Sequence, residues 1–196
     1  MSTRRSSQDR RCPECKVNLI YCFCDGLLKY NNRTKISVIM HKRELFLTSN
    51  TVNLARQTFD NFNLFIRGTE EKLTSQFVTP KNHIPLYLYP SEDAIELNQL
   101  NLEATKTYNL IVPDGSWRQA KKIHRREPLL ENIQRVKITN IDKSKYSLRK
   151  QKYEYGLCTF EAIMHALKVI EPETPFEKLE SNFQTMVQAH IYARKK

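Results

Sequence analysis

The sequence predicts an α/β protein built on a largely parallel sheet with helices on both faces. Short apolar segments of strand length alternate with amphipathic segments of helical period from residue 35 onward. Turn residues bound each apolar segment, as is typical of strands buried on both faces of a parallel sheet. This alternation over a chain of 196 residues favours one ordinary domain with a full hydrophobic core.

Five short apolar segments are expected to form the strands. They cover residues 35–40, 64–68, 86–90, 108–113 and 135–139.

Helical patterns occupy 50–59, 91–100, 159–167 and 174–196, and a further helix is expected to follow Ser116. Ser91 is the expected N-cap of the second helix. Thr174 and Glu177 form a capping box, with Pro175 at the first helical position.

The charge of the chain indicates a polyanionic partner. Lys and Arg number 32 against 21 Asp and Glu, which gives a net charge of +11. Because cationic side chains displace the counterions condensed on phosphates, a nucleic acid is favoured over a surface that is basic only for solubility. Residues 1–11 predict a mobile basic tail. No apolar run reaches the roughly 18 residues of a membrane span or resembles a signal peptide, so a cytoplasmic protein is expected.

Four of the five cysteines lie close together in residues 12–26. Cys12 and Cys15 form a C-x2-C knuckle, and Cys22 and Cys24 follow as C-x-C after a short hairpin. Disulfides are not expected in the cytosol, and four unrelated thiols would be scattered along the chain. The spacing therefore predicts one structural zinc ion with all four positions filled by sulfur.

The segment "IVPDGSWRQAKKIHRR" allows two interpretations. Ser116 and Gln119 match a capping box, so the segment is explained as a turn and a helix whose Trp117 faces the core. However, Asp114 follows the end of an expected central strand, where open α/β sheets bind ligands. The helix start also offers free amides to an anion. One face of this helix is cationic and is expected to bind a phosphate backbone through Arg118, Lys121, Lys122, Arg125 and Arg126.

A series of short motifs resembles the DTW-domain family of tRNA-uridine aminocarboxypropyltransferases. In family order these are "CPEC", "CFC", "HKRE" at 41–44, "SNT" at 49–51, "LYPS" at 88–91, "PDGSW" at 113–117, "LR" at 148–149 and "TFEA" at 159–162. Ser116 replaces the usual Thr and keeps the hydroxyl, and Cys158 stands where a small residue such as Ser is expected.

The resemblance implies a SPOUT-like fold for residues 27–196, with a trefoil knot in the C-terminal half. It also implies S-adenosylmethionine as cofactor, held by three loops. The implied cofactor-binding residues are Tyr89, Pro90, Ser91, Pro113, Gly115, Ser116, Leu157, Cys158 and Thr159.

The implied reaction joins the 3-amino-3-carboxypropyl group of the cofactor to uridine N3 and releases 5′-methylthioadenosine. Asp114 is the candidate base, or else it holds the cofactor's amino group. Trp117 is a candidate for stacking on the base. His41 and Glu44 are candidates for orienting the substrate or Asp114, and Arg149 for contacting a phosphate or the transferred carboxylate.

Two rival functions follow from the same residues. One is an RNA methyltransferase on the same fold, which would release S-adenosylhomocysteine. The other is a non-catalytic zinc-containing RNA-binding protein, which leaves the turn at Asp114 unexplained. The expected partner is tRNA, with neither DNA nor a membrane expected. The sequence leaves open which uridine is modified and whether the protein self-associates.

Overall fold

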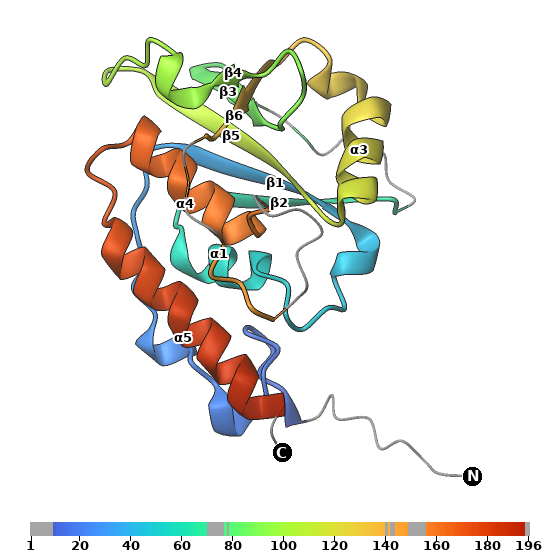
Figure 1. Cartoon of the computed structure of the whole chain (residues 1–196), viewed down its shortest axis with the longest axis vertical. Helices are drawn as coiled ribbons and strands as arrows, with labels where there is room; N and C mark the ends of the chain where they lie inside the picture. Colours follow the sequence, from blue (N-terminus) through green and yellow to red (C-terminus); the bar gives the residue numbers. More distant parts are fainter. Residues whose placement is uncertain are drawn as a thin grey trace.

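A parallel β-sheet forms the centre of the molecule (Figure 1). The computed structural model describes residues 10–69, 77, 79–139, 141, 144–148 and 156–194. Within them, the order of the strands across the sheet is β2-β1-β5-β3-β6-β4, and every neighbouring pair is parallel. The strands are β1 (Lys35–His41), β2 (Phe62–Arg67), β3 (His83–Leu88), β4 (Ile95–Glu96), β5 (Thr107–Asp114) and β6 (Gln134–Lys137). The five expected strands and the parallel sheet are confirmed.

Helices cover both faces of the sheet, as the sequence predicts (Figure 1). Helix α3 (Trp117–Arg126) lies on one face, while α1 (Val52–Thr58) and α4 (Thr159–Ile170) lie on the other. The long helix α5 (Phe176–Arg194) packs against α1 and α4. Short 3₁₀ helices complete the described elements: η2 (Leu19–Tyr21), η3 (Cys24–Gly26), η4 (Lys42–Glu44), η5 (Leu97–Gln99) and η6 (Pro128–Leu130).

The alternation of side chains along the central strands builds two separate cores. Leu110 and Val112 of β5 join the core beneath α1, α4 and α5, whereas Ile111 joins the core beneath α3. Ile39 and Tyr87 of the neighbouring strands pack beside Ile111 on that second face. Because both faces are buried, these strands are mainly apolar with no polar alternation, and the buried Ser37 of β1 donates a hydrogen bond to Asn109 of β5.

The prediction of a helix at 91–100 is wrong. This segment contains a turn, the short strand β4 and the 3₁₀ helix η5. Ile95 pairs with Val136 of β6, and Ala94 and Leu97 are buried on either side of this pairing. Sheet pairing at the open edge of β6 therefore overrides the helical preference of the segment, and Ser91 caps no helix.

The start of α5 also differs from the expected capping box. The helix begins at Phe176, and the carbonyl of Pro175 accepts from the amide of Leu179. The hydroxyl of Thr174 is buried and donates to the carbonyl of Leu167. Thr174 therefore ties α5 to the end of α4, a tertiary contact that the local pattern does not contain.

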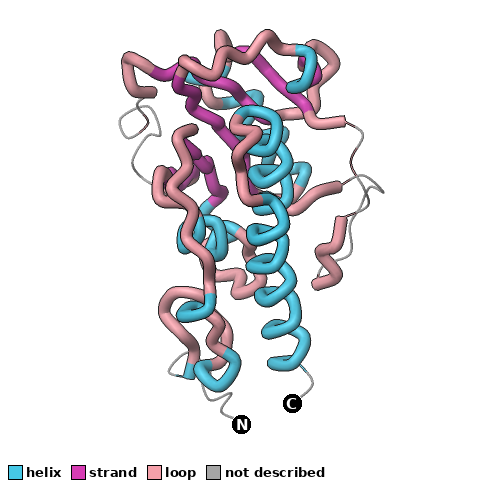
Figure 2. The backbone as a smooth tube through the Cα atoms, turned by 90° about the vertical axis from the view of Figure 1, so that its left-hand side faces the viewer, coloured by secondary structure: helices cyan, strands magenta, loops and turns pink. Residues whose placement is uncertain are grey.

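The cysteine-containing N-terminal segment lies beside the C-terminal half of α5 (Figure 2). Cys12, Cys15, Val17 and Phe23 belong to the same hydrophobic core as α1, α4 and α5. Farther along, the side chain of Asn182 in α5 forms hydrogen bonds with both backbone groups of Leu28 at 2.8 and 3.0 Å. The segment is thus anchored to the main domain along α5.

Some expectations fall outside the described residues. Of the expected basic tail, only residues 10 and 11 are described, and Arg149 is not. The C-terminal trefoil knot stays a prediction. In the described part of the chain, no helix combines the length and apolarity that crossing a membrane requires.

Candidate active site and metal centre

Three strand ends gather the candidate residues at one edge of the sheet. Met40 of β1 is paired with Asp114 at the end of β5, and Tyr87 of β3 is paired with Ile111. Because all three strands are parallel, the residues that follow them meet at the same carboxyl edge. The structure therefore brings the regions of His41, Asp114 and Tyr89 together from distant parts of the sequence.

Asp114 lies at the centre of a buried hydrogen-bond network. Asp114 is buried, with only 5% of its surface exposed. Asn50 donates from Nδ2 to Asp114 Oδ2 at 2.8 Å, and Thr159 donates from Oγ1 to Asp114 Oδ1 at 2.5 Å. The same Nδ2 of Asn50 lies 3.5 Å from Oε2 of the buried Glu44. Two donors therefore stabilise the charge of Asp114, and Asn50 connects it to a second carboxylate.

Asn50 is a residue of this site that the sequence analysis did not single out. Its Oδ1 accepts from the amide of Val52 at 2.8 Å, at the start of α1, which leaves Nδ2 directed at Asp114. The neighbouring Thr51 accepts on Oγ1 from the amide of Phe160, at the start of α4. The "SNT" motif thus joins two helices to the end of β5. The available clue was its position immediately before the pattern of α1.

Glu161 of the "TFEA" motif holds the loop that precedes α4. Its carboxylate is buried and accepts from Ser144 Oγ at 2.6 Å, from the amide of Lys145 at 2.8 Å and from the amide of Cys158 at 3.0 Å. Burial, and then the nearby charge of Glu161, raises the pKa of the Cys158 thiol. Cys158 is therefore a neutral thiol at the N-cap of α4, beside the half-buried Leu157.

The turn after Asp114 has a structural explanation of its own. Gly115 has φ of +150°, and a Cβ there would lie 2.9 Å from Cβ of Gln119. Ser116 accepts on Oγ from the amide of Gln119, whose side chain accepts from the amide of Ser116 at 2.5 Å. The predicted capping box at the start of α3 is confirmed, and Pro113 precedes it as part of β5.

Trp117 does not face the core. Ala120 and Ile123 of α3 are buried as the helical pattern predicts, but Trp117 is 40% exposed. It is the first residue of α3, three positions before the buried Ala120. Its side chain is therefore accessible to a ligand.

A cationic cavity of about 230 Å³ opens beside the start of α3. His41, Arg43, Arg118 and Lys122 are among its lining residues, and the remaining ones are Lys42, Ser116 and Gln119. Burial lowers the pKa of His41, and the charges of Arg43 and Arg67 add to this effect, so the imidazole is neutral at pH 7. Its Nδ1 accepts from the amide of Arg43 at 3.2 Å. The neutral ring therefore carries its proton on Nε2 as a donor.

His41 and Glu44 lie in one turn, as the sequence indicates, with His41 as the N-cap of η4, but their side chains have different surroundings. His41 lines the cavity under α3, whereas Glu44 is buried near Asn50 on the other face. Lys121, Arg125 and Arg126 are exposed along α3 and extend the cationic surface beyond the cavity.

Tyr89 lies with the aromatic side chains on the α3 face. Its ring stacks on His124 of α3, with the centroids 4.3 Å apart, and on Tyr87 at 5.6 Å. Pro90 is exposed and Ser91 is half-buried in the turn that follows. The loop 89–91 thus reaches the same edge as Asp114, although the ring of Tyr89 belongs to the opposite face of the sheet.

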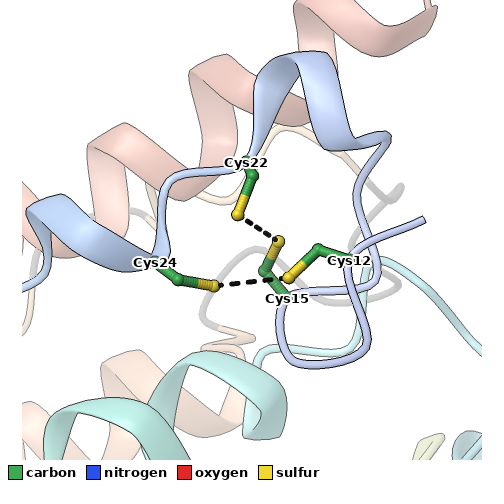
Figure 3. Close-up of side chains that lie close together, drawn as sticks. All are labelled: Cys12, Cys15, Cys22 and Cys24. Carbon is green, nitrogen blue, oxygen red and sulfur yellow. Dashed lines mark hydrogen bonds between the residues drawn. The ribbon is translucent and has the colours of Figure 1, made fainter. Parts of the chain in front are cut away.

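The four clustered cysteines point their sulfur atoms at one another (Figure 3). Sγ of Cys12 lies 3.7 Å from that of Cys24, and Sγ of Cys15 lies 3.9 Å from that of Cys22. All four sulfurs are within 4.8 Å of one another. A tetrahedral metal about 2.3 Å from each sulfur requires separations of about 3.8 Å, so the cluster is arranged to bind a metal ion.

The backbone around Cys12 and Cys15 forms the turn that such a site needs. The amide of Lys16, which has φ of 62°, donates to the carbonyl of Cys12. Burial raises the pKa of Cys15 to about 11. Burial also acts to raise the pKa of Cys12, but hydrogen bonds from the amides of Cys15 and Glu14 hold it at about 7. The cluster thus combines a readily ionised thiol, Cys12, with Cys15 and Cys24, whose pKa burial raises and whose ionisation a cation would favour.

Comparison with known proteins places this chain in a family. The model of the DTW domain matches residues 9–191, and the chain therefore belongs to the DTW-domain family. A relative from Drosophila melanogaster, tRNA-uridine aminocarboxypropyltransferase 2, is 26% identical over 173 residues, which are 82% of this chain and 66% of the relative. A protein of the same name from Macaca fascicularis is 26% identical over 167 residues, 82% of this chain and 56% of the relative. The chain thus spans less than two thirds of either relative. No solved structure matches it significantly.

Proposed function

We propose that this protein transfers the 3-amino-3-carboxypropyl group of S-adenosylmethionine to N3 of a uridine in tRNA and releases 5′-methylthioadenosine. The observation that carries the proposal is the buried Asp114, fixed by Asn50 and Thr159 at the carboxyl edge of a parallel sheet. Membership of the DTW-domain family and the names of the two relatives support the same reaction.

The loops at this edge fit the proposed cofactor. Asp114 accepts from Thr159, so the loop after β5 and the loop before α4 are in contact, and β3 delivers the loop 89–91 beside them. The residues proposed to hold the cofactor are those of the three loops at 89–91, 113–116 and 157–159. When bound, S-adenosylmethionine supplies an electrophilic carbon next to a sulfonium leaving group. A SPOUT-like fold with a C-terminal knot is part of the same proposal.

Asp114 is proposed to act as a fixed negative charge. Both of its oxygens accept hydrogen bonds from side chains that are themselves held by helices, so its position is fixed before a ligand arrives. Such a carboxylate suits an ammonium group better than it suits the transfer of a proton. The cations around the cavity near His41 are proposed to stabilise negative charge on the RNA instead.

The cationic surface of α3 is proposed to bind the tRNA backbone. It consists of exposed residues on one helix, next to a cavity that is lined by further cationic side chains. Arg149 is proposed to contribute from outside the described residues. The sulfur cluster is proposed to hold a structural zinc ion, because four thiolates leave no position for a catalytic water.

The test is product analysis with purified protein, unmodified tRNA transcript and S-adenosylmethionine. Mass spectrometry of the digested nucleosides is expected to show one aminocarboxypropyl-uridine, together with methylthioadenosine in equal amount. Release of S-adenosylhomocysteine with a methylated nucleoside would assign the protein to the methyltransferases. Binding of tRNA without any reaction of the cofactor would leave only the binding function.

A further inference from the structure

An exposed apolar tip, Leu45–Phe46–Leu47, stands beside the Asp114 network. Phe46 is 82% exposed, the highest value among the large apolar residues in the described part of the chain. Leu45 and Leu47 are 39% and 41% exposed. None of the three belongs to either hydrophobic core or packs against one. Three adjacent apolar residues held in water indicate an interaction site, unlike single scattered ones.

The apolar tip is held by hydrogen bonds on both sides. The amide of Leu47 donates to the carbonyl of Glu44 at 3.0 Å, and the amide of Asn50 donates to the carbonyl of Leu47 at 3.0 Å. The carbonyl of Ser49 accepts from the hydroxyl of Tyr146. Glu44 and Asn50, which bracket the tip, are buried in the Asp114 network. The tip is therefore fixed in position relative to Asp114.

The charges around the apolar tip are complementary to a nucleic acid. Lys42 and Arg43 are exposed, are separated from the tip only by the buried Glu44, and line the cationic cavity together with Arg118 and Lys122 of α3. An aromatic side chain beside a track of cations is the arrangement by which proteins bind single-stranded nucleic acid, with phosphates on the cations and a base on the ring. An apolar tip for a hydrophobic protein partner would not need these charges.

Uridine N3 lies on the base-pairing edge, so an enzyme reaches it only when the base is unpaired and turned out of its stack. We propose that Phe46 stacks on an unpaired base next to the target uridine in the tRNA, an inference that rests on the proposed function. The ring replaces the stacking that the neighbouring base loses when the uridine turns toward Asp114. Leu45 and Leu47 keep water from the sides of the ring.

The test compares Phe46→Ala and Phe46→Trp with the control Ile84→Ala. Ile84 is 42% exposed but lies at the opposite end of β3. Loss of one stacked base lowers kcat/KM for the tRNA transcript by roughly 5- to 150-fold in Phe46→Ala, with unchanged affinity for S-adenosylmethionine. Phe46→Trp and Ile84→Ala are expected to react like the wild type. A fluorescent adenine analogue placed next to the target uridine should be quenched by the wild type and not by Phe46→Ala.

Equal kcat/KM and equal quenching for Phe46→Ala and the wild type would overturn the inference while leaving the proposed function intact. A change of sedimentation coefficient in Phe46→Ala without any change in tRNA affinity would also overturn it, and would assign the tip to an interface between copies. If the wild type modifies no uridine, the proposed function fails. The tip is then judged by direct binding of the transcript, where weaker binding by Phe46→Ala supports it and equal binding refutes it.

Discussion

The two faces of the sheet receive neighbouring residues from the same strand ends, and the resulting sites have opposite character. Beneath α1 and α4, the side chains of Glu44 and Asp114 are buried and bonded to neutral donors. Beneath α3, His41 lies in an open cavity surrounded by lysine and arginine. The difference follows from the alternation of side chains along a strand, which sends Met40 and His41 to opposite faces.

Under the proposed function, binding of the tRNA backbone and the chemical step would take place on opposite faces of the sheet. A carboxylate in the cationic cavity would repel RNA phosphates and compete for the cations. Placed on the other face and buried, Asp114 keeps its charge without contributing to the surface potential of α3.

The largest effect is expected for Asp114→Asn. Loss of the negative charge should lower the single-turnover rate by roughly 10²–10³-fold, the range for loss of one preorganised electrostatic contact. The free energy of unfolding should fall by about 1–3 kcal/mol, because one buried donor loses its acceptor.

The measurement is methylthioadenosine formation on purified tRNA, with the affinities for cofactor and tRNA determined separately. Loss of cofactor affinity supports a role in holding the amino group, whereas loss of rate alone supports a base. Affinity for tRNA should not change. Turnover at the wild-type rate would make Asp114 only a structural residue of the turn.

Cys22→Ser tests the metal centre, which lies against α5 and far from the cationic surface in the fold. Loss of one sulfur ligand should abolish stoichiometric zinc and lower the free energy of unfolding by more than roughly 4 kcal/mol, a large effect of the kind that the loss of a structural metal produces. Cys158→Ser is the matched control, because Cys158 lies outside the cluster and Ser is a good N-cap. Metal analysis and urea unfolding decide the point. Unchanged zinc content in Cys22→Ser would contradict the assignment.

His190 makes the stability of the α5 layer depend on pH. Burial, together with Arg194 and Arg11, lowers its pKa to about 4. Because the unfolded chain binds a proton near pH 6.5 and the folded one only near pH 4, this contribution is complete above pH 6.5 and is lost as the pH falls toward 4.

The expected loss at pH 5 is roughly 2 kcal/mol for the wild type, and His190→Gln should not show it. Urea unfolding at pH 7 and pH 5 measures both proteins. Any loss of metal at low pH affects the two equally and cancels. Parallel pH profiles for the two proteins would show that His190 is not the titrating group.

The smallest effect is expected for reversal of charge on α3. Lys121→Glu combined with Lys122→Glu should weaken tRNA binding by roughly tenfold, and the slope of its salt dependence should fall by about one unit for each phosphate that is no longer neutralised. The matched control is Lys168→Glu combined with Lys178→Glu, two exposed lysines of α4 and α5. Cofactor affinity should be unchanged in both. Equal tRNA affinities of the two double variants would exclude the α3 surface as the binding site.

Local patterns predicted most of the secondary structure. The continuous apolar segments gave the five main strands, because burial on both faces leaves a strong signal in the sequence. Ser116 and Gln119 gave the start of α3 because a capping box forms within one turn. The errors occurred where distant parts of the chain decide: residues 91–100 pair with β6, and Thr174 bonds to Leu167.

The sequence by itself determined the class of the fold, the cluster of four cysteines and the acid at the end of β5, since these depend on residue type, periodicity and short spacing. Only the tertiary structure decided which residues meet Asp114. Asn50 and Thr159 are 64 and 45 residues away in the sequence. Parallel pairing of β1 with β5 brings Asn50 to Asp114, and packing of α4 against β5 brings Thr159. The tertiary structure also leaves Trp117 and Phe46 exposed. It places the side chains of His41 and Glu44 on opposite faces of the sheet. The packing of helices over the sheet decides which side chains at a strand end are buried and which face they lie on, and no local pattern encodes this packing.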